Sequence, residues 1–302
     1  MNTAKVRKRL LPVVSFLLTG LALWFVGRQV WSRRTDLREA LTGAELLPLL
    51  IGVVLAIFAM TWIAAVWKWV LGQLGATVSY ADTVPAYYVG ELGKYIPGGL
   101  WPILGRGELL RRRGVARHVA YPSVFLSLGL LYISAAVVSA VAMPLVGVVG
   151  RSSPLLYLGV VGAAIAGTGA LHPRVLAVVR SRVSISRLDD LQVLSWRAVW
   201  ELVLAYVPTW LAVGLSTSAI AVAVSDDVNV AHVAVAAIVS WLVGFLIFPV
   251  PGGIGVRESV FIALAGLADV EGLAVALIAR FAFVAVDVGG FALALLVGRV
   301  RR

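Results

Sequence analysis

Apolar segments long enough to cross a membrane recur along the chain, and polar residues gather between them. A transmembrane α-helix needs roughly 20 apolar residues. Six unbroken segments of about that length lie at residues 10–27, 46–67, 120–143, 154–171, 199–222 and 272–297. The first follows a basic start and lacks a small-residue cleavage site, so we expect it to be retained as a span. No long polar block separates the segments, which predicts an all-α integral membrane protein with one polytopic domain over residues 1–302.

Two further apolar segments, residues 82–104 and 232–268, are interrupted by Pro-Gly-Gly motifs. The residues at these breaks are Pro97, Gly98 and Gly99 in the first segment, and Pro251, Gly252, Gly253 and the nearby Gly255 in the second. Proline removes a backbone donor and clashes with the preceding turn, and glycine adds backbone freedom, so both motifs predict helix ends. Non-helical backbone at membrane depth is tolerated only where protein or a watery cavity surrounds it. We therefore predict two re-entrant hairpins made of broken helices.

The two interrupted segments also resemble each other. Residues 89–99 read VGELGKYIPGG and residues 243–253 read VGFLIFPVPGG, which are identical at six of eleven positions without a gap. Chance similarity in a Gly- and Val-rich sequence is one explanation. The other is an internal repeat, because broken segments at corresponding places in two halves of a chain indicate a transporter binding site. The repeat interpretation divides the chain into halves at about residues 46–171 and 199–297.

The distribution of charge predicts that the two halves are inverted in the membrane. Cytoplasmic segments carry an excess of Lys and Arg. If the first hairpin leaves on the side where it enters, then the basic start, two basic loops and the tail all lie in the cytoplasm. The basic residues concerned are Lys5, Arg7, Lys8, Arg9, Arg111, Arg112, Arg113, Arg117, Arg174, Arg180, Arg182, Arg187, Arg299, Arg301 and Arg302. The acidic turns at residues 226–227 and 269–271 then lie outside, so the second hairpin enters from the exterior.

One segment disagrees with this topology. Arg28, Arg33, Arg34 and Arg38 would lie outside, against the positive-inside rule. Residues 30–45 either break the rule or lie along the membrane surface as an amphipathic segment.

Composition agrees with a membrane protein and argues against several other classes. Hydrophobic residues make up 61% of the chain and charged residues 14%, whereas about half of a soluble domain is apolar. The net charge of +11 comes mainly from loop and tail arginines without an aromatic-basic groove pattern, so we expect no nucleic-acid partner. There is no cysteine and the three histidines are isolated, so we predict no metal site and no cofactor. No nucleophile, base and acid gather at a recognisable spacing, so we expect no enzyme activity.

Ionisable residues cluster around both breaks. An ionised side chain at the centre of a membrane helix costs about 2.5–3.5 kcal/mol on insertion scales, so it needs a partner, a cavity or a function. Glu91 and Lys94 share a helical face before the first break. Arg257 and Glu258 follow the second break, where the amides that open a half-helix and a guanidinium could face an anion together.

Other candidate site residues lie on the last span and beside the first break. Arg280 and Asp287, seven residues apart, share a helical face and could reach the ionic pair after the second break. Tyr95 and Trp101 suit an aromatic belt at the membrane interface, and they could also contact a lipid headgroup. The candidate substrate-binding residues are therefore Arg257, Glu258, Glu91, Lys94, Arg280, Asp287, Tyr95 and Trp101.

A structural role is the alternative for these ionic pairs, which would then hold the hairpins against the bundle. That interpretation is favoured for Arg106 and Glu108, because both lie close to a basic loop and are expected at the membrane interface.

The sequences GELGKYIPGGLW, GRGELLRRRGV and FPVPGGIGVRES resemble the membrane domain of the lysylphosphatidylglycerol synthase/flippase family, over essentially the whole chain. The resemblance implies a bundle with two re-entrant hairpins that moves a modified phospholipid between leaflets. It points to Glu91, Lys94, Pro97, Gly98, Gly99, Pro251, Gly252, Gly253, Gly255, Arg257 and Glu258. Full-length synthases carry a soluble C-terminal aminoacyl-transferase domain that this sequence lacks, so we expect no aminoacylation.

Three functional hypotheses follow. The first is a lipid flippase or scramblase in the plasma membrane of a bacterium, with both termini cytoplasmic and with anionic or modified headgroups as ligands. The second is a soluble-solute or ion-coupled transporter that uses the same hairpins. The third is a non-transporting membrane partner of an envelope glycosyltransferase or lipid-modifying enzyme. The sequence leaves open a separate synthase or glycosyltransferase partner, and a homo-oligomer.

Overall fold

The computed structural model describes residues 42–95, 101–150, 154–182, 194–246, 253 and 255–300, with isolated residues between 28 and 38. Every regular element in this part of the chain is a helix. The helices are α3 (Leu46–Gln73), α4 (Tyr80–Glu91), α5 (Trp101–Arg112), α6 (Arg117–Val146), α7 (Pro154–Ala170), α8 (Pro173–Arg182), α9 (Trp196–Ala205), α10 (Val207–Val224), α11 (Val230–Leu246), α12 (Val256–Ala265) and α13 (Asp269–Val300), with 3-10 turns η1 (Leu92–Tyr95) and η2 (Val148–Gly150). The predicted span 10–27 and the residues Pro97, Gly98, Gly99, Pro251 and Gly252 lie outside the described residues.

Within the described residues, four helical stretches are long and apolar enough to cross a membrane. They are Leu46–Gln73, Arg117–Val146, Trp196–Val224 and Asp269–Leu296. They coincide with four of the predicted spans, and they make the chain a multi-pass membrane protein. The predicted span at 154–171 forms α7, which at 17 residues is shorter than the other four. The apolar side chains exposed on these helices, such as Leu145 and Leu293, suit contact with lipid.

The third of these stretches is interrupted at Tyr206, where α9 ends and α10 begins. Pro208 lies in the first turn of α10 and has no N–H to donate to the carbonyl of Leu204, so the helical hydrogen bonding is broken there. The buried Tyr206 hydroxyl and the Ser127 hydroxyl of α6 are 2.7 Å apart and hydrogen-bonded. This contact ties the break to the neighbouring span.

Small residues allow α3 and α10 to cross closely. A Cβ atom on Gly52 would lie 2.9 Å from Cγ1 of Ile220, and the Ser216 hydroxyl donates a 2.7 Å hydrogen bond to the Gly52 carbonyl. Close backbone approach and a hydroxyl that bonds across the crossing are typical of membrane helix packing.

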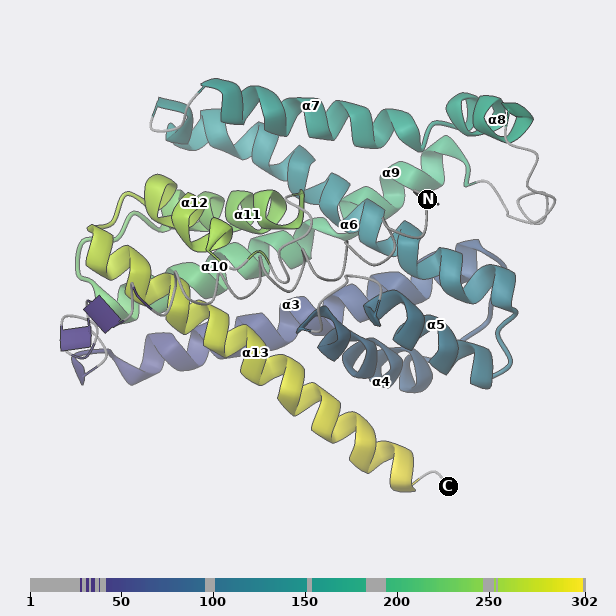
Figure 1. Ribbon diagram of the computed structural model, residues 1–302, viewed down its shortest axis with the longest axis horizontal. Coiled ribbons are helices and arrows are strands. Elements are labelled where there is room, and N and C mark those ends of the chain that lie inside the picture. The colour runs from purple at the N-terminus through teal and green to yellow at the C-terminus, as the bar shows by residue number, and fades with distance from the viewer. Residues whose placement is uncertain are drawn as a thin grey trace, which may run out of the picture.

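The first interrupted segment forms a helical hairpin of α4, η1 and α5 (Figure 1). The helices α4 and α5 pack against each other, and a Cβ atom on Gly93 would lie 2.9 Å from Cβ of Trp101. Arg113, directly after α5, forms an ion pair with Asp82 near the start of α4. The two ends of the hairpin therefore lie next to each other. With 12 residues, each helix is about 18 Å long, well short of the roughly 30 Å hydrocarbon core.

The second interrupted segment forms a hairpin of α11 and α12. The two helices pack against each other, and a Cβ atom on Gly253 would lie 2.8 Å from Cα of Gly244. Gly253 and Gly255 have φ of 63° and 84°, a backbone conformation that residues with a side chain rarely adopt. Helices therefore end and restart around both Pro-Gly-Gly motifs, as predicted.

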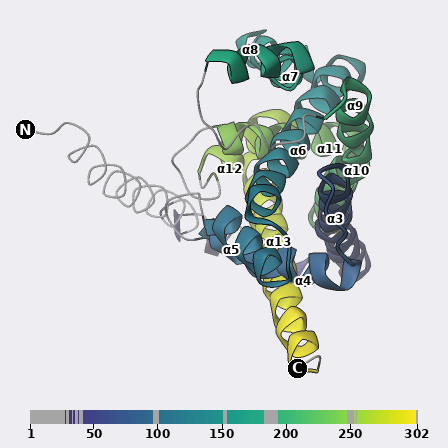
Figure 2. The same cartoon turned by 90° about the vertical axis from the view of Figure 1, so that its right-hand side faces the viewer.

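The last helix, α13, contacts both hairpins. It packs against α12 and, further along, against α4 and η1, and its C-terminal part projects beyond the other helices in both views (Figures 1 and 2). Tyr88 of α4 packs on Gly290 of α13 so closely that a Cβ atom there would lie 2.2 Å from the tyrosine ring. The ionic residues of α13 are thereby placed next to both hairpins.

Candidate functional site

A buried ionic cluster joins the first hairpin to α13. Lys94 Nζ lies 2.6 Å from Asp287 Oδ2 and 2.9 Å from Glu91 Oε1, so one ammonium is shared by two carboxylates. The Tyr95 hydroxyl donates a 2.6 Å hydrogen bond to the same Asp287 oxygen. The Asp287 side chain is completely buried, whereas that of Lys94 is 24% exposed. The cluster therefore reaches the surface through Lys94 and through Tyr95, which is 40% exposed.

Arg106 of α5 is the second cation of this cluster. It is 2% exposed and forms an ion pair with Glu91, and its guanidinium lies 4.3 Å from the ring centroid of Tyr87. Arg106 lies inside the protein, because the face of α5 that carries it packs on α4. Glu108 lies on the exposed side of α5 and pairs with Arg111 and Arg112, which agrees with a structural role.

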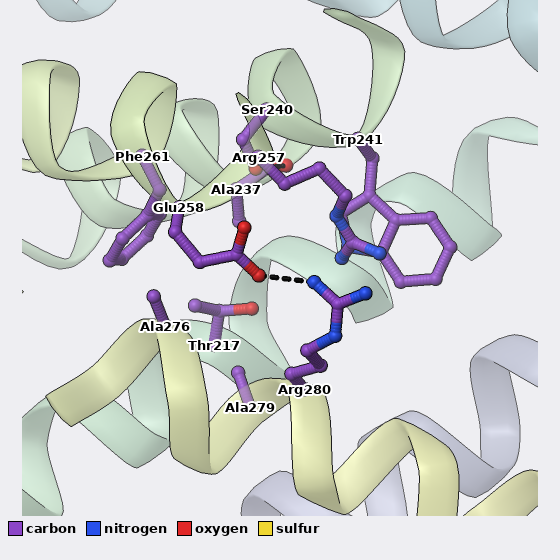
Figure 3. Close-up of a pocket in the computed structure, with 10 residues that line it drawn as sticks. All are labelled: Thr217, Ala237, Ser240, Trp241, Arg257, Glu258, Phe261, Ala276, Ala279 and Arg280. Carbon is purple, nitrogen blue, oxygen red and sulfur yellow. Dashed lines mark hydrogen bonds and ion pairs between the residues drawn. The ribbon is translucent and has the colours of Figure 1, made fainter. Parts of the chain in front are cut away.

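The second hairpin carries a pocket beside its ionic residues (Figure 3). The pocket lies between α10, α11, α12 and α13, and its lining includes Thr217, Ser240, Trp241, Arg257, Glu258 and Arg280. Glu258 forms an ion pair with Arg280 and accepts a 2.7 Å hydrogen bond from the Gly255 amide. The guanidinium of Arg257 lies over the ring of Trp241, 3.9 Å from its centroid.

The same three-residue arrangement occurs in both hairpins. The first helix of each hairpin carries an aromatic residue and, three positions later, a glycine. An arginine of the second helix contacts both. The sets are Tyr87, Gly90 and Arg106 in the first hairpin and Trp241, Gly244 and Arg257 in the second. In each hairpin a Cβ atom on the glycine would lie 2.3 Å from Cγ of the arginine, and the guanidinium lies over the aromatic ring.

The two arrangements differ in the residue that follows the glycine. In the first hairpin this residue is Glu91, which pairs with Arg106. In the second it is the uncharged Phe245, whose ring stacks on that of Tyr132 with centroids 3.5 Å apart. Among the residues that the structure describes, Arg257 has no carboxylate within ion-pair distance. One guanidinium is therefore neutralised inside its hairpin and the other is not.

Most of the predicted site residues come together, though in two groups rather than one. Arg280 reaches Glu258, as expected. Asp287 was expected to approach the same pair, but it contacts Lys94 and Tyr95 of the first hairpin instead, because α13 passes from one hairpin to the other. Trp101 starts α5, packs along Gly93 and is 49% exposed, outside both groups.

Two participants, Tyr87 and Trp241, were not predicted from the sequence. The signal was present, because extending the repeat comparison two residues toward the N-terminus aligns Tyr87 with Trp241. Both are aromatic without being identical, and a comparison based on identity stops before them.

These features define the class: a polytopic helical membrane protein whose ionic side chains are gathered on two helical hairpins and on the long helix that joins them. The chain belongs to the family of the lysylphosphatidylglycerol synthase transmembrane region, whose family model matches residues 12–288. The resemblance inferred from the two Pro-Gly-Gly motifs is thus confirmed. No curated protein is significantly similar to the chain in sequence.

Proposed function

We propose that this protein is a lipid flippase or scramblase of the plasma membrane. The two hairpins would enter the membrane from opposite sides as an inverted repeat, with the chain divided into halves at about residues 46–171 and 199–297. A headgroup would pass through the polar region beside the hairpins while its acyl chains stay in hydrocarbon. Family membership and the helices of the first hairpin, which are too short to cross the bilayer, both support this proposal.

The observation that carries the proposal is that Arg257 lines a pocket and has no carboxylate partner among the residues that the structure describes. A guanidinium kept inside a membrane protein without a carboxylate is costly unless a ligand supplies the anion. A lipid phosphate would be such an anion.

The third hypothesis, a non-transporting partner, is supported by the internal pairing of Glu91, Glu258 and Asp287, which would hold the hairpins in place. Arg257 is the exception to that pairing among the described residues. It therefore favours a ligand site over a purely structural cluster.

The test is transport of fluorescent phospholipids in liposomes that contain the purified protein, followed with a membrane-impermeant quencher. We expect the parent protein to move lipid between leaflets faster than empty vesicles do, and Arg257→Gln to slow that movement at least tenfold. Leu293→Ala, at an exposed apolar position of α13, serves as the matched control and is expected to retain the parent rate. Equal rates for the parent protein and empty vesicles would contradict the proposal.

A further inference from the structure

We infer that the pocket of the second hairpin selects a lipid phosphodiester of net negative charge and discriminates against headgroups that carry an additional cation, with Arg257 as the residue that neutralises the phosphodiester. The inference rests on the proposed function and specifies its substrate class.

The first step is the charge of the ionic residues on the hairpins and α13. The seven that belong to the two groups are Glu91, Lys94, Arg106, Arg257, Glu258, Arg280 and Asp287. Four of them are cations and three are carboxylates, so one positive charge is in excess. Because each carboxylate already has a cationic partner, the excess is located on Arg257.

The second step is the comparison of the two hairpins. Arg106 and Arg257 occupy equivalent arrangements, and Glu91 supplies the anion for the first. Phe245 stands at the corresponding place in the second hairpin and supplies none. The second hairpin therefore repeats the arrangement of the first but lacks a carboxylate at this position. A ligand phosphate would pair with Arg257 as Glu91 pairs with Arg106 in the first hairpin.

The third step is the shape of the donor. Trp241 covers one face of the Arg257 guanidinium, with 3.9 Å between the guanidinium carbon and the ring centroid. The N–H groups lie in the guanidinium plane, and no hydrogen-bond acceptor among the described residues engages them, which suits two parallel hydrogen bonds to phosphate oxygens. Arg280 lines the same pocket with its guanidinium, so a second cation stands nearby (Figure 3).

The fourth step concerns a headgroup with an additional ammonium, such as an aminoacylated glycerol phosphate. An ammonium in this pocket would meet Arg257 and Arg280 and find Glu258 already engaged by Arg280 and the Gly255 amide. Asp287 keeps one carboxylate oxygen without a hydrogen-bond partner, but that side chain is completely buried and paired with Lys94. An additional cation is therefore repelled in the pocket.

The experiment compares three labelled lipids in the liposome assay: phosphatidylglycerol with net charge −1, phosphatidylcholine with net charge 0 and lysylphosphatidylglycerol with net charge +1. We expect phosphatidylglycerol to move at least tenfold faster than lysylphosphatidylglycerol, with phosphatidylcholine between them. Phe245→Glu installs the missing carboxylate and is expected to abolish the preference, whereas Phe245→Leu keeps it. Equal or faster movement of lysylphosphatidylglycerol overturns the inference while the proposed function stands. Movement of none of the three contradicts the proposed function itself.

A binding measurement separates a headgroup site from a site for free phosphate and does not depend on transport. Short-chain phosphatidylglycerol is expected to raise the melting temperature of the detergent-solubilised parent protein more than inorganic phosphate at the same concentration does. Arg257→Gln, which retains a polar side chain, is expected to lose this shift, and it replaces Phe245→Glu if the latter does not fold. A larger shift with inorganic phosphate, or an unchanged lipid shift in Arg257→Gln, contradicts the inference.

Discussion

Asp287 of α13 and Lys94 of the first hairpin form a buried ion pair with 2.6 Å between Oδ2 and Nζ. Two turns earlier on the same helix, Arg280 pairs with Glu258 of the second hairpin. Residues seven apart lie on one helical face, so a single face of α13 holds both hairpins. The two hairpins are therefore linked to each other through this helix.

Replacing Asp287 tests whether this link stabilises the protein. Asp287→Asn keeps the size of the side chain but removes the charge, and loss of one partner from a buried ion pair costs roughly 3–5 kcal/mol. Because Lys94 keeps Glu91, we expect a loss of about 3 kcal/mol in the free energy of unfolding, measured by denaturation in detergent. Glu201→Gln, which breaks an exposed pair with Arg197, is the control and should cost under about 1 kcal/mol. Equal losses of stability in the two variants would show that the pair between Asp287 and Lys94 stabilises the protein no more than an exposed ion pair does.

The repeated contact between glycine and arginine predicts a steric effect in both hairpins. In Gly90→Ala and Gly244→Ala the new Cβ atom would lie 2.3 Å from the arginine Cγ, so the arginine must move. Overpacking of this kind costs about 1–3 kcal/mol. Gly129→Ala in α6, where a Cβ atom has nothing within 4 Å, should be neutral or stabilising, since alanine favours a helix. The melting temperatures of the three variants provide the comparison.

The two variants should differ in transport as well. Displacing Arg257 removes the cation of the proposed site, whereas displacing Arg106 disturbs an internal pair. We expect Gly244→Ala to slow phosphatidylglycerol movement more than Gly90→Ala does at a temperature where both are folded. The reverse order would indicate that the first hairpin carries the site.

Glu91 and Glu108 test how burial changes the contribution of a glutamate–arginine ion pair to the stability of the protein. Hydrogen bonds from Arg111 and Arg112 lower the pKa of Glu108 to about 2. A carboxyl whose pKa is lowered by folding adds stability above its unfolded value and loses it as the pH falls toward the folded value. The stability difference between Glu108→Gln and the parent should therefore be small at pH 7, because the pair is exposed, and disappear between about pH 4 and pH 2.

Glu91→Gln should behave differently, because Glu91 pairs with the buried Arg106 and with Lys94. Its loss leaves a guanidinium in the protein interior without an anion, so we expect a loss of about 3–5 kcal/mol at pH 7. The measurement is denaturation of Glu91→Gln and Glu108→Gln at pH 7. Similar losses in the free energy of unfolding would show that burial does not change the contribution of the glutamate.

Much of the fold could be predicted from the sequence because length and apolar composition determine which helices can cross a membrane. The helix ends around both Pro-Gly-Gly motifs were also predictable, since proline and glycine act locally on the backbone. The partner of Asp287 was not, because it depends on the direction in which α13 crosses the hairpins. The burial of Arg106 depends likewise on which face of α5 packs on α4.

The topology of the hairpins can be tested directly because the natural chain contains no cysteine, so a single introduced cysteine reports its own accessibility. Ser79 and Ala116 flank the first hairpin and are exposed, and the ion pair between Asp82 and Arg113 keeps the two ends of that hairpin together. We expect Ser79→Cys and Ala116→Cys in intact cells to be protected from a membrane-impermeant maleimide and to react only after the membrane is permeabilised.

The second hairpin should give the opposite result if the halves are inverted. Asp227 and Ala268 flank it at exposed positions, so Asp227→Cys and Ala268→Cys should react in intact cells. Opposite accessibility of Ser79→Cys and Ala116→Cys would mean that the chain crosses the membrane between them, which α4 and α5 could do only as one continuous span. The same accessibility for all four positions would agree with two hairpins but would show that both enter from the same side, so that the repeat is parallel. A headgroup would then meet the charged ends of both hairpins from one side of the membrane.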